Sequence, residues 1–92
     1  MNVVIVGDGK VGHSLAEQLS SEGHDVVVID NSPDKLKNSD TRLDIIAVQG
    51  NGVNYTVQLE AGVPKADLLV AATPSDECNM LCCLVAHKLG AK

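Results

Sequence analysis

The clearest chemical signal in this sequence is a glycine motif near its start, where Gly7, Gly9 and Gly12 have the spacing G-x-G-x-x-G. Gly7 allows a tight turn after a strand, Gly9 lets the backbone approach a phosphate without a Cβ in the way, and Gly12 lets the following helix pack closely on the sheet. The helix N-terminus then presents unpaired N–H groups and a partial positive charge. The motif therefore predicts a turn that binds pyrophosphate.

A carboxylate at the end of the next apolar run supports this interpretation. Val26 to Ile29 predict a strand, and Asp30 closes it, 18 residues after Gly12. There the carboxylate can accept hydrogen bonds from both hydroxyls of an adenosine ribose. It would repel a 2′-phosphate, and no arginine follows it closely, so NAD is favoured over NADP. In the alternative interpretation, the glycines serve only a tight turn and Asp30 is a solvated strand end.

Two more polar segments follow predicted strands. Asn51, in the run Gly50-Asn51-Gly52, comes at the end of the third strand, where it would touch the adenine or its ribose, or else form a plain turn. Thr73 and Pro74 follow the fourth strand, where they would border the second ribose or the nicotinamide. Because Thr73 can equally cap the next helix, both interpretations stay open.

The elements that must position these residues form a repeat. Four apolar runs, at residues 3–6, 26–29, 45–48 and 68–71, are each followed by a turn and a segment of helical character. Continuous apolar strands indicate burial on both faces, which is typical of parallel strands covered by crossover helices. We therefore expect an α/β fold, a Rossmann-like parallel sheet of four βα units with strand order 3-2-1-4.

The helices between these strands have recognisable ends. The first starts around residue 11 and stops at Gly23, and a short second one opens at residue 33 and fades near residue 38. The third covers about 53–61, with Gly62 as its C-terminal cap and Pro64 blocking its continuation. The fourth ends at Gly90. Its start is predicted at Thr73-Pro74, with Thr73 as the N-cap and the proline at the first helical position.

A complete dinucleotide fold has about six strands in two halves, so we expect residues 1–92 to be one domain and a fragment of a longer chain. The fourth strand would then be an edge. Residues 80–86 form an unbroken apolar run that leaves the last helix apolar nearly all round. We therefore expect self-association, as a homo-oligomer, through this strand and helix.

No residue pattern predicts catalysis or a metal site. Cys78, Cys82 and Cys83 do not form paired CxxC motifs and are expected to serve in packing, as reduced thiols. Asp76 and Glu77 are adjacent acids, but the first turn of a helix favours acids through its dipole.

The overall charge excludes some partners. The formal charge is -5, which argues against binding nucleic acid or an anionic membrane by bulk electrostatics. The longest apolar stretches, 68–72 and 80–86, are far shorter than a membrane span, and the N-terminus runs directly into a strand rather than a signal peptide. These features predict a cytoplasmic protein that does not insert into a membrane.

The glycine motif, the stretch Ala66-Asp67-Leu68-Leu69-Val70-Ala71 and the pattern T-x-S-D-E-x-N from Thr73 to Asn79 together resemble the KTN or RCK family, which includes the N-terminal domains of TrkA-type regulators of potassium uptake. This resemblance spans the whole chain. It implies a cytosolic regulatory domain that binds NAD or NADH, or ATP or ADP in related domains. It also implies oligomers that lie beneath a membrane-embedded potassium-translocating subunit. The implied nucleotide contacts are Gly7, Asp8, Gly9, Lys10, Val11, Gly12, Asp30, Asn51, Thr73 and Pro74.

Two other functions fit part of the pattern. The chain would be the cofactor-binding half of an NAD-dependent dehydrogenase if a substrate domain followed, although no proton donor is identifiable. A methyltransferase-like nucleoside binder fits the glycines and the acid, but fits the full G-x-G-x-x-G spacing less well.

Overall fold

The computed structural model describes residues 1–7, 10–31, 45–73 and 75–90. Its centre is a sheet of four parallel strands: β1 (Asn2–Val6), β2 (Asp25–Asp30), β3 (Ile46–Gln49) and β4 (Leu68–Ala71). Their order across the sheet is β3-β2-β1-β4, which confirms the predicted Rossmann-like topology. The predicted helix at 33–38 lies outside the described residues.

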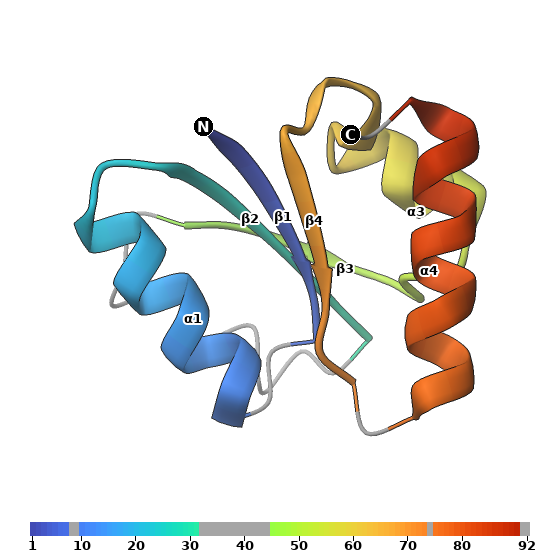
Figure 1. Ribbon diagram of the computed structural model, residues 1–92, viewed down its shortest axis with the longest axis horizontal. Helices are drawn as coiled ribbons and strands as arrows, with labels where there is room; N and C mark the ends of the chain where they lie inside the picture. The colour runs from blue at the N-terminus through green and yellow to red at the C-terminus, as the bar shows by residue number, and fades with distance from the viewer. Residues whose placement is uncertain (8–9, 32–44, 74, 91–92) are drawn as a thin grey trace.

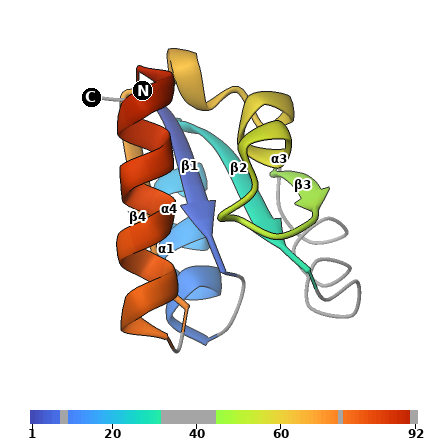
Figure 2. The same cartoon turned by 90° about the vertical axis from the view of Figure 1, so that its right-hand side faces the viewer.

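Helices cover both faces of this sheet. Helix α1 (Lys10–Ser21) lies on one face, and α3 (Tyr55–Glu60) and α4 (Asp76–Leu89) lie on the other (Figure 1). In the view turned by 90°, α4 crosses in front of the sheet and α1 behind it (Figure 2). Within the described residues, no helix combines the length and the apolar character that crossing a membrane requires.

The two faces of the sheet have separate apolar cores because successive strand residues point to opposite sides. The face beneath α1 buries Val3 and Ile5 of β1, Val26 and Val28 of β2, Ile45 and Ala16. The opposite face buries Val4 and Val6 of β1, Ile29, Ala61, Val63, Ala66, Cys82 and Ala86. As predicted, β1 is buried on both sides throughout Val3 to Val6. The same prediction is wrong for the edge strands β3 and β4, which are only partly buried because each has a neighbouring strand on one side among the described strands, and Ile46 is 66% exposed.

Helix α4 begins later than the sequence predicts, and Thr73 is not its N-cap. Ser75 caps the helix, because its Oγ accepts a hydrogen bond from the Cys78 N–H at 3.2 Å. At the other end Gly90 adopts φ +105°, in the left-handed region that glycine tolerates best.

Helix α3 is also shorter than the predicted 53–61. Asn54 is its N-cap, and its Oδ1 accepts hydrogen bonds from Thr56 N at 2.8 Å and Val57 N at 3.2 Å. The chain continues past Gly62 into a 3₁₀ turn at Val63–Lys65. Pro64 is therefore part of a short helical turn before β4, because its missing N–H is tolerated at a helix start.

Candidate functional site

The carboxyl ends of the strands meet along one edge of the sheet. Val6, the last residue of β1, pairs with Ile29 of β2 and with Ala71 of β4. Just beyond this row the Gly7 N–H donates to the Ile29 carbonyl at 2.7 Å, and the Ala72 N–H donates to the Val6 carbonyl at 2.8 Å. The crossover helices change faces between β1 and β4, so this is the switch point at which open α/β sheets bind ligands.

Gly7 is in close contact with the end of β4. Its φ is +102°, and a Cβ at this position would lie 2.8 Å from the Ala72 carbonyl oxygen and 3.4 Å from Thr73 Cγ2. A Cβ on Gly12 would overlap the Gly7 carbonyl oxygen. Only glycine permits both approaches, so the turn after β1 lies directly against the start of α1 on one side and the end of β4 on the other.

Asp30 lies at the same edge, at the end of β2. Its carbonyl oxygen accepts a hydrogen bond from Gly50 N at 2.9 Å, and its side chain is half-buried. By strand alternation, Asp30 projects from the same face as Val28, which is the face that α1 covers. The carboxylate and the N-terminus of α1, at Lys10, therefore border one side of the sheet edge.

The loop after β3 packs against β1. A Cβ on Gly52 would overlap Val6 Cγ1, so this glycine brings the loop onto the first strand. Asn51 is exposed, and its Oδ1 accepts a hydrogen bond from Val53 N at 3.0 Å, while its backbone carbonyl accepts one from Asn54 N at 2.9 Å. The side-chain oxygen of Asn51 thus stabilises the turn itself.

Thr73 is held by α4 rather than capping it. The Thr73 N–H donates to Asn79 Oδ1 at 3.0 Å, and Asn79 Nδ2 donates to the Thr73 carbonyl at 3.1 Å. The Thr73 hydroxyl also donates to Asn79 Oδ1 and accepts from Ser75 N at 3.3 Å. Asn79 contacts Thr73 through both ends of its amide.

Five of the predicted site residues lie at this one edge: Gly7, Gly12, Asp30, Asn51 and Thr73. Asp8, Gly9 and Pro74 lie outside the described residues. Lys10 and Val11 form the start of α1, and their backbone is thereby placed next to the turn.

Gln58 is a buried polar residue that the sequence did not single out. Its side chain is 0% exposed, and Nε2 donates to the Gly52 carbonyl at 2.6 Å and to the Cys82 carbonyl at 3.1 Å. It therefore joins the loop after β3 to the middle of α4. Gln58 is the only buried residue of α3, whose Tyr55 and Leu59 are exposed, so no pattern in the sequence of this helix pointed to it.

The cysteines of α4 differ in exposure. Cys82 is buried, Cys78 is half-buried and Cys83 is exposed. Burial, reinforced by the neighbouring Cys78, raises the pKa of the Cys82 thiol to about 12. Across residues 1–7, 10–31, 45–73 and 75–90, no group of three or more histidine, cysteine or acidic side chains is arranged to hold a metal ion.

The histidines nearest the N-terminal half lie on α1 and before β2. His13 Nε2 lies 3.8 Å from Glu17 Oε2, one turn apart on α1. His24 Nδ1 contacts the Met1 amino group at 3.2 Å, at the amino ends of the strands. Neither histidine lies at the end of β4, where a nicotinamide would be expected.

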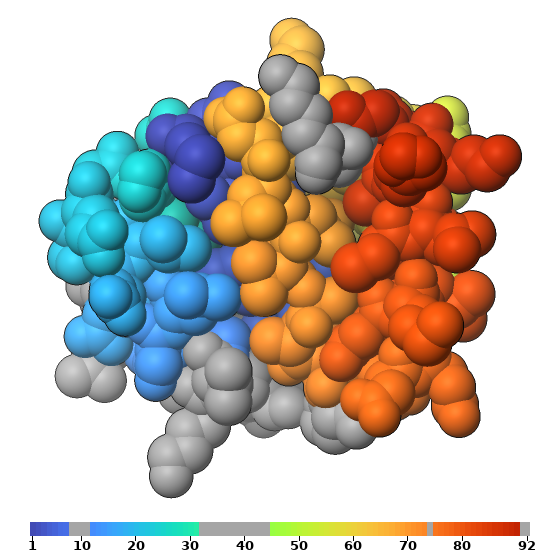
Figure 3. Space-filling view, in the orientation of Figure 1, coloured from blue at the N-terminus to red at the C-terminus, as the bar shows by residue number. Residues whose placement is uncertain are grey.

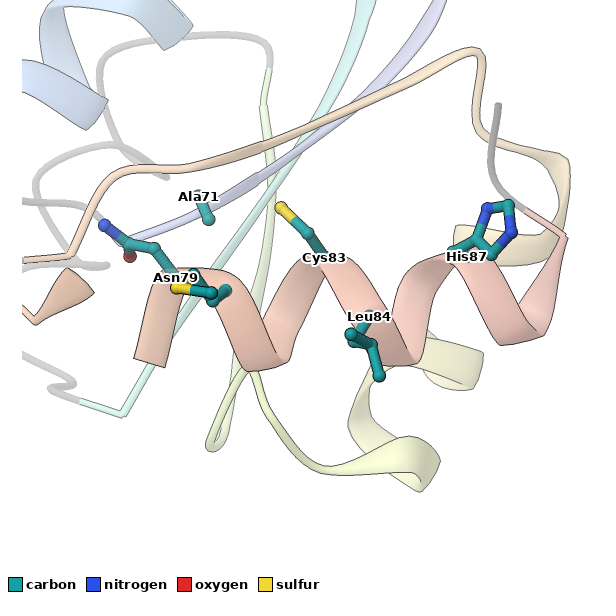
Figure 4. Close-up of a pocket in the computed structure, with 6 residues that line it drawn as sticks. Ala71, Asn79, Cys83, Leu84 and His87 are labelled. Carbon is teal, nitrogen blue, oxygen red and sulfur yellow. The ribbon is translucent and has the colours of Figure 1, made fainter. Parts of the chain in front are cut away.

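A shallow groove of about 500 Å³ separates β4 from the outer side of α4 (Figure 4). Its lining is mostly apolar and consists of Ala71, Asn79, Met80, Cys83, Leu84 and His87. Asn79 lines this groove and also contacts Thr73, so one end of the groove lies next to the carboxyl end of β4.

The chain is similar to proteins of known family. The TrkA-N domain model matches residues 3–92. The Trk system potassium uptake protein TrkA of Halomonas elongata is 46% identical over 89 residues, which are 97% of this chain and 20% of that protein. The chain thus spans about a fifth of the length of this curated relative.

Solved structures agree. The TrkA-N domain of the inner membrane protein ybaL from Escherichia coli superposes with a TM-score of 0.89 at 26% identity, covering 97% of this chain and 65% of that one. The Shewanella denitrificans Kef CTD in its AMP-bound form gives 0.82 at 26% identity, covering 96% and 52%. By its sequence match and its fold, this chain belongs to the TrkA-N domain family.

Proposed function

We propose that this chain is a regulatory domain that binds NAD or NADH at the carboxyl edge of its sheet. The observation that carries the proposal is the contact of Gly7 with Ala72 and Thr73 at the switch point, on the same edge as Asp30. Related adenosine nucleotides, such as ATP, ADP and AMP, share the half of the ligand that Asp30 would hold. The AMP-bound Kef structure supports this inclusion.

The residues fit such a ligand through backbone geometry rather than positive charge. The N-terminus of α1 would bind the pyrophosphate through its N–H groups and the helix dipole, and Gly7 lets the chain before this helix approach Ala72 and Thr73 closely. Asp30 would accept hydrogen bonds from the adenosine ribose, since its half-buried carboxylate lies on the α1 side of the edge. The second half of the dinucleotide would then extend over β1 toward Thr73.

The partner that this domain would regulate is a membrane-embedded potassium-translocating subunit, with the domain on the cytoplasmic side. Support comes from the name of the Halomonas elongata relative, a potassium uptake protein, and from the ybaL domain, which belongs to an inner membrane protein. Nucleotide binding would bias the conformation of the complex rather than drive a reaction. The competing proposal, a dehydrogenase half, would need an acid or base near the nicotinamide.

Titration calorimetry with NADH tests the main proposal. We expect the unsubstituted chain to bind NADH, and the near-ultraviolet absorbance of the reduced nicotinamide to persist when small carbonyl compounds are added. No binding of NADH or AMP would contradict the proposal. Binding followed by steady loss of that absorbance would favour the dehydrogenase alternative.

We also propose that two copies of this chain associate through β4 and α4. Among the described strands β4 pairs only with β1, so its other edge offers unpaired backbone groups. In Figure 3, β4 is exposed between the blue atoms of α1 and the red-orange atoms of α4. Large apolar side chains are exposed on the same elements: Leu68, Met80, Leu81 and Leu84. A second copy that pairs along β4 would cover both features at once.

A further inference from the structure

Asn79 completes the end of β4 with a side chain. Its Oδ1 accepts from the Thr73 N–H at 3.0 Å, and its Nδ2 donates to the Thr73 carbonyl at 3.1 Å. One planar amide thus satisfies both backbone groups of the same residue, as a neighbouring strand would do. The Thr73 hydroxyl donates to the same Oδ1.

Asn79 is itself fixed by backbone and side-chain hydrogen bonds. It lies in the first turn of α4, where its N–H donates to the Ser75 carbonyl at 3.0 Å, and Ser75 caps that turn. Its side chain is half-buried at the start of the groove between β4 and α4 (Figure 4). The position of Thr73 is therefore set by the position of α4.

Thr73 in turn borders the switch point. Its Cγ2 would lie 3.4 Å from a Cβ on Gly7, and the Ala72 carbonyl would lie 2.8 Å from it. The Thr73 hydroxyl already forms hydrogen bonds, because it donates to Asn79 Oδ1 and accepts from Ser75 N at 3.3 Å. Thr73 would therefore contact a ligand through its fixed position at the end of β4. We call this group of Thr73, Ser75 and Asn79 the β4 corner.

We propose that Asn79 is a positioning residue for the half of the dinucleotide that extends over β4. It acts through Thr73, and the inference rests on the proposed nucleotide function. Asp30 and Thr73 lie on opposite sides of β1, because the strand order is β3-β2-β1-β4. A ligand held only by the Asp30 side, such as AMP, does not depend on Asn79. A dinucleotide that reaches Thr73 does depend on Asn79. Without the Asn79 hydrogen bonds Thr73 would be less ordered, and binding would have to order it again.

The test compares NADH with AMP on the same variants by titration calorimetry. We expect Asn79→Ala to weaken NADH binding about ten-fold and to leave AMP binding within about two-fold. Glu60→Ala is the control, since Glu60 is exposed on α3, outside the groove and outside the proposed contact between copies, and should change neither affinity. A second readout is the exchange rate of the Thr73 amide proton, which should rise in Asn79→Ala and not in Glu60→Ala.

A second variant covers the case in which Asn79→Ala does not fold. Asn79→Asp keeps the acceptor for the Thr73 N–H and loses the donor to the Thr73 carbonyl, so we expect the same preferential loss of NADH affinity. Equal losses for NADH and AMP, or no loss for either, would overturn the inference while the proposed function stands. Failure of the unsubstituted chain to bind either NADH or AMP would overturn the proposed function and this inference with it, and binding of AMP alone would overturn this inference.

Discussion

Gln58 of α3 and Cys82 of α4 are joined through the core by a side-chain hydrogen bond. Gln58 Nε2 donates to the Cys82 carbonyl at 3.1 Å and to the Gly52 carbonyl at 2.6 Å. Both amide hydrogens are thereby used, whereas Gln58 Oε1 is buried without a hydrogen-bond partner among the described residues. The two donated bonds hold α3, α4 and the loop after β3 together, and we expect them to outweigh the cost of the unpaired acceptor.

Replacing Gln58 with leucine should destabilise the fold. Gln58→Leu removes both donors from buried carbonyls and also removes the unpaired Oε1, so we expect a net loss of about 1 to 3 kcal/mol in the free energy of unfolding. Gln58→Glu should cost more, because a carboxylate would face the same two carbonyls. Urea denaturation measures both losses. Unchanged stability in both variants would show that these bonds contribute nothing.

Gly7 and Gly23 form a matched pair for testing the contact at the switch point. Both have positive φ, +102° and +90°, but a Cβ on Gly23 would meet no atom within 4 Å. Gly23→Ala should therefore cost about 1 to 2 kcal/mol from backbone strain alone. Gly7→Ala should cost about 1 to 3 kcal/mol more, because its Cβ would press on the Ala72 carbonyl. Equal losses in thermal or urea unfolding would argue against this close approach.

The buried Cys82 thiol should make the fold sensitive to alkaline pH. Burial raises its pKa from 9.0 to about 12, so the folded state keeps a proton that the unfolded state loses. The stabilisation is complete below about pH 9 and is lost as pH rises toward 12, at about 1.4 kcal/mol per pH unit. Urea unfolding at rising pH should show a steeper decline for the unsubstituted chain than for Cys82→Ala. Identical slopes would contradict it.

Much of the fold could be predicted from the sequence because it depends on local, strong signals. Four apolar runs without polar interruption predicted parallel strands covered by helices, and the Rossmann pattern predicted the order β3-β2-β1-β4. Burial on both faces holds for β1 but not for the edge strands, since Ile46 of β3 is 66% exposed. The predicted strand bounds differ from the observed ones by a single residue at most, and β4 matches fully. The start of α4 was wrong because Thr73 and Ser75 are both good capping residues. In the structure the Thr73 hydroxyl is bonded to Asn79, and Ser75 Oγ accepts the hydrogen bond from the Cys78 N–H instead.

The candidate site was predictable only in part. Gly7, Gly12 and Asp30 lie where strand ends and a helix start place them, so spacing along the chain was sufficient. Asn79 and Gln58 act over six or more residues of sequence through side-chain amides, and no periodicity encodes such a contact. Their roles depend on how α4 packs against the sheet, which only the three-dimensional arrangement defines.

Asp30 should set the choice between NADH and NADPH. Its carboxylate would accept hydrogen bonds from the ribose hydroxyls and would repel a 2′-phosphate, so NADH should bind more tightly. Asp30→Ala removes charge-assisted hydrogen bonds worth about 1.5 to 3 kcal/mol. It should lower the affinity for NADH by about ten-fold or more and narrow the difference in affinity between NADH and NADPH. Calorimetry that gives equal affinities for NADH and NADPH in the unsubstituted chain would contradict this role.

Leu84 tests the proposed association between two copies. It is 62% exposed on the outer side of α4, so Leu84→Glu should leave the fold and the switch point intact. If β4 and α4 meet a second copy, a charge at this position would be buried without a partner. The dissociation constant of the dimer should then rise at least about ten-fold. Gln18→Glu, exposed on α1 on the other face of the sheet, adds the same single negative charge away from β4 and α4 and is the control. Sedimentation velocity at micromolar concentration measures the outcome, and a clean monomer for the unsubstituted chain would refute the association.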